Sequence, residues 1–544
     1  MGHGEAARPA LIEGLLRPAA YPHAVREPVG IAETHVSWVL LTGEFAYKVK
    51  KPLALSFLDY STLERRRHFC EEEVRLNRRF APDLYLACVP IGGSREAPRV
   101  GAAGPALEYA VQMRQFDPRQ ELGHLVDGGQ VTVGEIETLG RRIATIHATA
   151  QRVTAAEPWG EPDAVQRITT RNFPEIRALP EAAARSGALE ALERWVAAEF
   201  ARRQALMQRR RAAGHVRECH GDLHCGNVVR WSGELLPFDG IDFDPALRCI
   251  DVASDLAFLA MDLDSRGRPD LRAALLSGWL GTGGDCEALR LLPYYDVYRA
   301  LVRAKVASLQ ASQATPGSRP RTAAVATMNR YLDCALRRTQ PSTPLLLVTC
   351  GFSGSGKSWL SLRLAAALPA LRLRSDVERK RLAGLAPLAS SRSAPGGGLY
   401  TQEFTARTYG RLHDCARSSL LGGESIVLDA AYLRRAERAA ALDVARECGA
   451  DGLILHCDAP VETLRARVAE RQRLARDPSE ADVAVLERQL GFWEPFDDAE
   501  LSRLVAVDTG RASAVTLALA EIRRRTGAAG SGRRLGPYHE HVAG

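Results

Sequence analysis

Alternating apolar and polar positions dominate the first part of the chain. Residues 35–41 and 45–50 are apolar-rich runs joined by Thr42-Gly43-Glu44, which predicts a β-hairpin. Residues 107–116 form another apolar-rich run and predict a further strand. Charged and apolar residues recur at helical spacing elsewhere in this part, where we predict helices over residues 62–80, 138–150 and 189–211.

Short apolar runs mark the second part of the chain. Two prolines within residues 340–344 break the preceding helix, which is typical of a linker between domains. The apolar runs 345–350, 425–429 and 452–457 then alternate with helical segments, which predicts a parallel sheet with helices on both faces. The fold class is therefore an α+β domain followed by an α/β domain, and the predicted boundaries are residues 1–340, residues 341–526 and a disordered tail over residues 527–544.

The composition narrows the class of protein. The chain has 544 residues, of which 46% are hydrophobic and 25% charged, and this suits a globular protein of about two to four domains. The net charge of +7 is a weak excess that fits an anionic ligand such as a nucleotide without indicating nucleic acid. The 11 cysteines include no CxxC pair, so we expect neither a disulfide nor a zinc framework. With no signal-peptide pattern and no apolar stretch of bilayer length, the sequence predicts a soluble protein of the reducing cytoplasm without a membrane partner.

The segment ECHGDLHCGN carries the strongest chemical pattern before the linker. His220, Asp222 and Asn227 are spaced as HxDxxxxN. In phosphoryl transfer a carboxylate orients the acceptor hydroxyl and takes its proton, and an amide oxygen can bind the magnesium ion that bridges the phosphates. Asp242, 20 residues after Asp222, is the predicted second magnesium carboxylate. A zinc site is the alternative for this segment, but its four candidate ligands lie too close together for a usual zinc-finger spacing: Cys219, His220, His224 and Cys225.

A lysine on the predicted hairpin extends this pattern. Alternation places Ala46 and Lys48 on one face of the strand, where the small residue leaves room for adenine and the lysine reaches the phosphates. A lysine in this role needs a glutamate to hold it, and the following helix offers Glu73, which we favour, and Glu72. The KVKK segment is also typical of an exposed strand edge, so its interpretation depends on the motif that follows it.

These residues resemble the aminoglycoside phosphotransferase and choline kinase family, a branch of the protein-kinase fold. The resemblance covers roughly residues 30–310 and is carried by HGDLHCGN, IDFD and DVASDLAF. It implies a two-lobed kinase-like domain in which His220 positions the loop, Asp222 is the base, and Asn227 and Asp242 bind magnesium.

The same resemblance implies a hinge over adenine at residues 112–116, with Met113 as the nucleotide-binding residue. The chain also departs from the family. No GxGxxG loop precedes Lys48, and no aminoglycoside-binding feature is recognisable, so antibiotic resistance does not follow.

A phosphate-binding loop follows the linker. The segment GFSGSGKS matches GxxxxGK[ST] in full and stands between a predicted strand and an apolar helix. Its backbone N–H groups would surround phosphate oxygens at the helix N-terminus, Lys357 would reach the β- and γ-phosphates, and Ser358 would bind magnesium. The predicted nucleotide-binding residues are Gly351, Ser353, Gly354, Ser355, Gly356, Lys357 and Ser358.

Carboxylates and arginines after this loop indicate a kinase. Asp376 and Arg379, spaced DxxR, would activate a substrate hydroxyl and clamp an anionic part of the substrate, although Asp376 is also a good helix cap. Asp429 ends a predicted strand, at the position of a magnesium-orienting or substrate carboxylate. Arg467 and Arg471 recur on one helix face, as in a lid over the transferring phosphoryl group, and a plain solvated helix is the alternative.

Over about residues 345–510 the chain resembles the P-loop kinases that include polynucleotide 5′-hydroxyl kinases, gluconate kinases, chloramphenicol phosphotransferase and zeta toxins. As a whole it is similar to a bacterial family of bifunctional aminoglycoside phosphotransferase/ATP-binding proteins. The resemblance implies an ATP- and magnesium-dependent phosphotransferase acting on a hydroxyl of a small molecule. Two alternatives stay open. One is a regulatory or sensor protein with a non-catalytic module, and the other is a nucleic-acid 5′-hydroxyl kinase, for which interleaved aromatic and basic residues would be expected.

Overall fold

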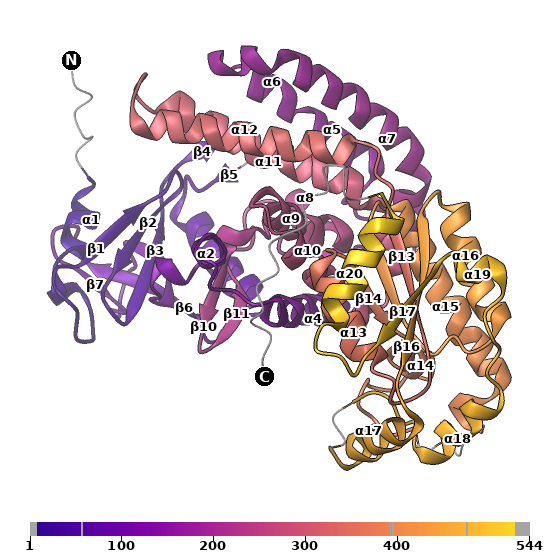
Figure 1. Ribbon diagram of the computed structural model, residues 1–544. Coiled ribbons are helices and arrows are strands. Elements are labelled where there is room, and N and C mark those ends of the chain that lie inside the picture. Colours follow the sequence, from indigo (N-terminus) through magenta and orange to yellow (C-terminus); the bar gives the residue numbers. More distant parts are fainter. Residues whose placement is uncertain (1–7, 56–57, 392, 394–396, 475–476, 528–544) are drawn as a thin grey trace. The chain divides into compact units, whose positions relative to one another are not determined.

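The predicted hairpin belongs to a six-stranded antiparallel sheet in the structure, which is a computed structural model (Figure 1). The strand order is β1-β2-β3-β8-β6-β7. The strands are β1 Gly30–Glu33, β2 Ser37–Leu41, β3 Phe45–Lys50, β6 Tyr85–Gly93, β7 Pro98–Val100 and β8 Glu108–Arg114. The helix predicted over residues 62–80 is α2, Leu63–Asn77, which begins after the N-cap Thr62 and packs against β6 and β8.

The contacts divide the chain into two units. The first comprises residues 1–131, 149–161 and 209–255, and the second comprises residues 132–148, 162–208 and 256–544. The predicted domain boundary at residue 340 lies within the second unit and stays a prediction. The predicted tail lies, after residue 527, outside the described residues, which are 8–55, 58–391, 393, 397–474 and 477–527.

Short strand pairs flank the HGDLHCGN segment in the first unit. β9, Val216–Glu218, precedes the segment and pairs with β12, Cys249–Asp251. β10, Val228–Trp231, follows it and forms a hairpin with β11, Glu234–Pro237. The segment is thus anchored by strands on both sides. The other elements of this unit are α1 Ala10–Leu15, η1 Pro18–Ala20, β4 Ala54–Leu55, β5 Leu58–Asp59, η2 Pro118–Gln120, α3 Leu122–Asp127, η4 Cys225–Asn227 and α8 Pro245–Arg248.

Helices make up most of the chain between the hairpin region and the linker. The helices predicted over residues 138–150 and 189–211 correspond to α4 and α7, which both begin earlier than predicted, and α4 ends one residue earlier. None of the described helices is both long and apolar enough to span a membrane. The helical elements are α4 Val133–Thr149, α5 Pro162–Thr170, α6 Asn172–Arg177, η3 Pro180–Arg185, α7 Ser186–Ala212, α9 Val252–Ser265, α10 Pro269–Gly283, η5 Cys286–Leu291, α11 Leu292–Gln313 and α12 Arg319–Thr339.

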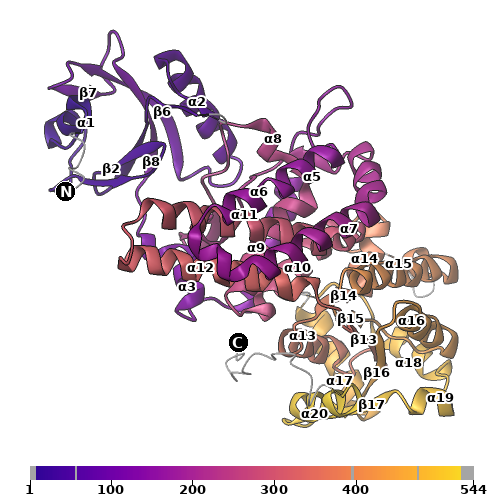
Figure 2. The ribbon, with the colours of Figure 1, turned by 90° about the horizontal axis from the view of Figure 1, so that it is seen from above.

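A parallel five-stranded sheet follows the linker, in the order β14-β15-β13-β16-β17. Its elements are β13 Leu345–Cys350, α13 Lys357–Ala367, β14 Leu371–Arg374, α14 Ser375–Leu382, η6 Gly398–Tyr400, α15 Gln402–Leu421, β15 Ile426–Asp429, α16 Arg435–Glu447, β16 Asp451–Asp458, α17 Val461–Leu474, α18 Val483–Gly491, α19 Asp498–Leu501, β17 Leu504–Asp508 and α20 Ala514–Arg525. Helices α13 and α20 cover one face and α15 and α16 the other (Figures 1 and 2). The predicted parallel sheet with helices on both faces is confirmed.

A buried group of four charges joins the helices before the linker to this sheet within the second unit. Arg272 of α10 donates to Asp296 of α11 at 2.8 Å and to Glu424, just before β15, at 2.7 Å. Arg338 of α12 donates to the same Glu424 oxygen at 2.7 Å and lies 2.9 Å from Asp296. Arg272, Asp296 and Glu424 are buried. We call these four residues the Glu424 cluster.

A disulfide also joins these two parts of the second unit. Cys286 of η5 is bonded to Cys415 of α15, with 5.0 Å between their Cα atoms. The cysteine spacing predicted no disulfide, and on this point the prediction is wrong. The two residues are 129 positions apart in the sequence, so only the packing of η5 on α15 brings them together.

Candidate active sites

Lys48 and Glu73 meet at the sheet of the first unit. Lys48 Nζ donates to Glu73 Oε1 at 2.8 Å and to Asp239 Oδ1 at 2.6 Å. Burial alone would raise the pKa of Glu73, but Lys48 and Lys50 lower it to about 2. Glu72 instead accepts two hydrogen bonds from Arg75. Of the two glutamates considered from the sequence, Glu73 is therefore the one placed to hold Lys48.

Asp242, the predicted magnesium carboxylate, lies in a buried ion pair. Lys50 Nζ donates to Asp242 Oδ2 at 2.5 Å, and Tyr60 OH lies 3.3 Å from the same oxygen. Asp239 follows β11 closely, has a side chain that is 46% exposed and contacts Lys48. This geometry favours Asp239 over Asp242 as the carboxylate that faces a nucleotide, because Asp242 is enclosed with Lys50.

The predicted catalytic loop has an ordered internal arrangement. Asn227 Nδ2 donates to the Asp222 backbone oxygen at 2.9 Å and to Asp222 Oδ2 at 3.0 Å. The amide nitrogen of Asn227 is thus used within the loop, and its amide oxygen is the side-chain atom that could accept a metal ion. The Asp222 side chain is 35% exposed, so it can reach a bound molecule.

His220 supports this loop from the interior. Its Nε2 hydrogen-bonds with the Phe238 backbone oxygen at 2.8 Å, and Asp255 accepts from the backbone N–H groups of His220 and Gly221. Burial lowers the pKa of His220. The bond to Phe238 joins the loop to the residue before Asp239. The zinc alternative requires Cys219, His220, His224 and Cys225 to bind one ion. Among the described residues, these four do not form one group of metal-ligating atoms.

Met113, the predicted hinge residue, lies in β8 directly opposite Ala46 of β3. Both side chains belong to one apolar cluster, which also contains Leu236 and Phe238. Apolar side chains therefore surround the strand positions next to Lys48, as contact with an adenine ring would require.

The phosphate-binding loop connects β13 to α13 in the second unit. Gly351, Gly354 and Gly356 have φ angles of +144°, +83° and +83°, which favour glycine. A Cβ atom at Gly354 would lie 2.6 Å from the Leu464 backbone oxygen, so the loop has no room for a side chain there. Lys357 Nζ donates to the Gly351 and Phe352 backbone oxygens at 2.8 and 2.6 Å, which curls its side chain back over the loop.

Asp429 lies beside the loop at the end of β15. Ser358 Oγ donates to Asp429 Oδ1 at 3.2 Å, and Arg372 Nη2 donates to Asp429 Oδ2 at 2.6 Å. Burial alone would raise the pKa of Asp429, but Arg372 and Arg374 lower it below its usual value. The predicted pair Ser358 and Asp429 is thus brought together. Arg372, which sequence analysis did not single out, holds the carboxylate in place from the neighbouring strand β14.

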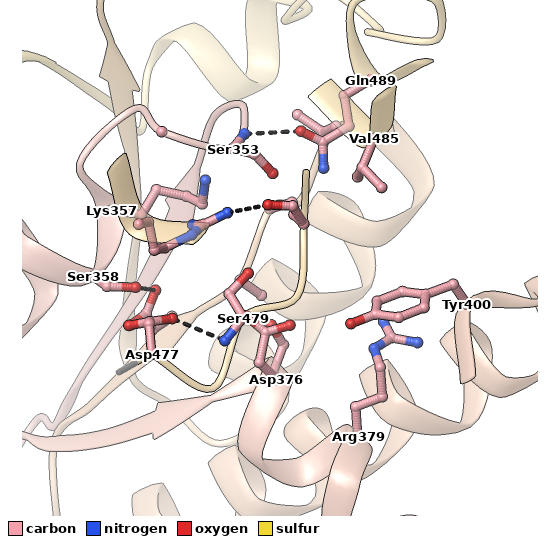
Figure 3. Close-up of a pocket in the computed structure, with 18 of the residues that line it drawn as sticks. Ser353, Lys357, Ser358, Asp376, Arg379, Tyr400, Asp477, Ser479, Val485 and Gln489 are labelled. Carbon is pink, nitrogen blue, oxygen red and sulfur yellow. Dashed lines mark hydrogen bonds between the residues drawn. The ribbon is translucent and has the colours of Figure 1, made fainter. Parts of the chain in front are cut away.

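Asp376 and Arg379 lie on α14, across the pocket from the phosphate-binding loop. Arg379 is buried, donates to the Leu399 backbone oxygen at 2.6 Å and to Thr405 Oγ1 at 3.1 Å, and lies over the Tyr400 ring at 5.0 Å. The Asp376 carboxylate makes no hydrogen bond or ion pair with another described residue, and it lines the pocket. In the view of Figure 3, it lies between Ser358 and the pair formed by Arg379 and Tyr400.

The predicted lid arginines lie on α17. Arg467 Nη1 donates to the Gly354 backbone oxygen at 3.3 Å, and Arg471 Nη2 donates to the Ala481 backbone oxygen at 2.6 Å. Gln489 of α18 accepts a hydrogen bond from Ser353 N at 2.8 Å. Both helices therefore contribute to the same pocket as the loop, and Gln489 is a pocket residue with no local sequence signal.

These residues enclose a cavity of about 380 Å³. Figure 3 shows Lys357 and Ser358 on one side and Arg379 and Tyr400 on the other. The cavity combines a loop for phosphate, a carboxylate, a buried arginine and two lid arginines. Such a set can bind a polyphosphate and a second small molecule side by side.

Comparison with known proteins agrees with this geometry. The family model described as "Phosphotransferase enzyme family" matches residues 63–292, and the model described as "AAA domain" matches residues 346–496. The uncharacterized protein Rv2004c of Mycobacterium tuberculosis H37Rv is 30% identical over 475 residues, which cover 87% of this chain and 93% of that protein. The uncharacterized protein Mb2027c of Mycobacterium bovis matches with the same values.

Solved structures match parts of this chain. A gluconokinase from Sinorhizobium meliloti 1021 is 23% identical and covers 34% of this chain and 94% of its own, with a TM-score of 0.25. The amicoumacin kinase hAmiN, in complex with AMP-PNP, Ca²⁺ and Ami, is 14% identical and covers 58% of this chain and 90% of its own, with a TM-score of 0.34. The family assignment depends on the relatives that match over most of their length, and the family models identify the two domains. The protein belongs to the family of Rv2004c, and it joins a kinase-like phosphotransferase domain to a P-loop kinase domain.

Proposed function

We propose that both domains are ATP- and magnesium-dependent kinases and that each transfers the γ-phosphate to a hydroxyl group of a small molecule in the cytoplasm. For the P-loop domain, the observation that carries this proposal is Asp376. It is a carboxylate without a described partner, in a pocket whose opposite side is the phosphate-binding loop. A nucleotide-binding protein that only senses nucleotide has no need of such a group, whereas a kinase needs it to orient the acceptor hydroxyl.

In the P-loop domain, Lys357 would contact the β- and γ-phosphates, and Arg467 and Arg471 would neutralise charge on the transferring group. Ser358 and Asp429 would hold a magnesium ion, directly or through water, and their 3.2 Å hydrogen bond shows that both reach one point. The ion supplies charge neutralisation between the phosphates. Asp376 would take the proton of the acceptor hydroxyl, and Arg379 would bind an anionic group of the acceptor.

In the kinase-like domain, Lys48 would bind phosphate oxygens while Glu73 holds it in position. We assign the magnesium site to Asn227 and Asp239, since the amide oxygen and the exposed carboxylate are the oxygen ligands that magnesium prefers. Asp222 would be the base. His220 would position the loop through its bond to Phe238.

Nucleotide stoichiometry tests the proposal. The full chain should bind two ATP molecules, and Lys48→Met and Lys357→Ala should each remove one of them. Loss of the lysine that contacts the phosphates should weaken ATP binding at the affected site by about 2–5 kcal/mol. Isothermal calorimetry with magnesium measures the number of ATP molecules bound per chain. Lys51→Met is the matched control, because Lys51 pairs with Glu33 outside both sites. A wild-type chain that binds one ATP, or none, would exclude two active modules.

Arg379 tests the nature of the acceptor. Arg379→Ala should raise the acceptor KM by a factor equivalent to about 1–3 kcal/mol and leave ATP binding unchanged, since a charge-assisted hydrogen bond to the acceptor is lost. The acceptor comes from a screen of sugars, nucleosides and oligonucleotide 5′ ends with labelled ATP. The exposed Arg407, on α15, supplies the control variant Arg407→Ala. An unchanged KM in Arg379→Ala would rule out an anionic acceptor group at this position.

A further inference from the structure

Five charged residues form an alternating series at the kinase-like site. Asp239 contacts Lys48 at 2.6 Å, Lys48 contacts Glu73 at 2.8 Å, Glu73 contacts Lys50 at 2.7 Å and Lys50 contacts Asp242 at 2.5 Å. One carboxylate, Glu73, therefore holds two lysines, one on each of its oxygens. The phosphate-binding role needs only one of them.

The two lysines differ in their access to solvent. Both lie on β3 two positions apart, so their side chains leave the same face of the strand. The Lys50 side chain is only 1% exposed, enclosed by Glu73, Asp242 and Tyr60. Lys50 therefore cannot reach a phosphate, and its charge acts only on the residues around it.

Asp239 and Asp242 belong to one short segment, FDGID. Asp239 has a φ of +60°, which non-glycine residues rarely adopt, and its N–H donates to Tyr85 OH at 3.0 Å. Gly240 N donates to Asn77 Oδ1 at 2.7 Å. The segment is thus fixed to β3 by two ion pairs, one at Asp239 and one at Asp242, while backbone bonds fix the turn between them.

The ion pair at Asp239 conflicts with nucleotide binding. Lys48 is required on phosphate oxygens and Asp239 on magnesium, so their 2.6 Å contact has to open when both ligands arrive. The pair between Lys50 and Asp242 has no such conflict, because neither group faces the nucleotide. It can keep the segment in place while the other pair separates.

We propose that Lys50 is a positioning residue, which holds Glu73 and the FDGID segment so that Lys48 can exchange Asp239 for a phosphate oxygen without displacing the metal carboxylate. This role rests on the proposed function of the kinase-like site. Lys50 acts on magnesium through Asp242 and the turn, and on Lys48 through Glu73.

The test uses the full chain with Lys357→Ala, so that only the kinase-like site binds nucleotide. The measured quantity is the magnesium enhancement, defined as the ATP Kd in EDTA divided by the ATP Kd in excess Mg²⁺. Lys50→Met should lower the magnesium enhancement by about 10- to 100-fold, as loss of a residue that supports a metal ligand does. The ATP Kd in EDTA, which depends on Lys48 and Glu73 without the metal, should rise by a much smaller factor than the ATP Kd in excess Mg²⁺. Lys51→Met, next to it in sequence, is the matched control and should behave like the parent.

The double variant Lys50→Met/Asp242→Asn distinguishes loss of the positioning role from the destabilisation caused by an unpaired buried charge. It removes both charges of the pair, so its melting temperature should return toward that of the parent while its magnesium enhancement stays low. If Lys50→Met does not fold, Asp242→Asn alone should show the same loss of enhancement. A parental enhancement in Lys50→Met, in Asp242→Asn or in the double variant overturns the proposal. A parent that shows no magnesium enhancement overturns the proposed function of the site as well.

Discussion

Replacing Asp222 with asparagine is expected to slow phosphoryl transfer at the kinase-like site about 100- to 10,000-fold, the range that general base catalysis contributes. The asparagine oxygen can still accept the hydrogen bond from Asn227 that Asp222 Oδ2 accepts at 3.0 Å, so the loop should keep its shape. The amide cannot take the acceptor proton. Nucleotide affinity should therefore remain at the parental value while the rate falls.

Single-turnover transfer in the Lys357→Ala background measures this effect, with an acceptor taken from the screen. The ATP Kd is measured in parallel. Asp83→Asn, an exposed aspartate outside the loop, is the control for the loss of a carboxylate. Transfer by Asp222→Asn at the parental rate would mean that another group takes the proton.

Replacing Glu424 with alanine is expected to lower the free energy of unfolding of the second unit by about 3–5 kcal/mol, since a buried ion pair loses one partner. Arg272 and Arg338 would keep only Asp296 between them, and neither arginine can lose its proton. Burial alone would raise the pKa of Glu424, but the two arginines lower it to about 2 from the usual 4.5. The contribution of Glu424 is therefore complete above about pH 4.5 and is lost as the pH falls toward 2.

Urea unfolding at neutral pH measures this loss, and the same series at lower pH tests the titration. Glu447→Ala removes an exposed partner of Arg417 and should cost at most about 1 kcal/mol. A loss in Glu424→Ala no larger than in this control would show that the cluster is not a source of stability.

Local sequence was enough to predict the parts of both sites that are contiguous. The P-loop lies between a strand and a helix as its pattern predicts, and Asp222 and Asn227 are in contact because their spacing fits one tight loop. The choice between Glu72 and Glu73 depended on the phase of α2, which spacing alone left open. Asp239, which we propose as a metal carboxylate, was not singled out from the sequence, because the exact end of β11 decides which aspartate of FDGID turns toward Lys48.

Residues that reach a site from a distant element were beyond sequence reasoning. Gln489 meets Ser353 across 136 positions, and Arg372 meets Asp429 across 57. No sequence motif marks either contact, because the first depends on how α18 packs beside the loop and the second on how β14 does. The same holds for Cys286 and Cys415, which join only after η5 packs on α15.

The Glu424 cluster also sets an order of events during synthesis. The ribosome completes α12 at Thr339 and then adds 85 further residues, the last of which is Glu424. At about 5–20 residues per second this takes roughly 4–17 s. Throughout that interval Arg272 and Arg338 have one carboxylate, Asp296, for two positive charges. The charges of the helices before the linker are therefore balanced only when the strand region of the P-loop domain that carries Glu424 has been made.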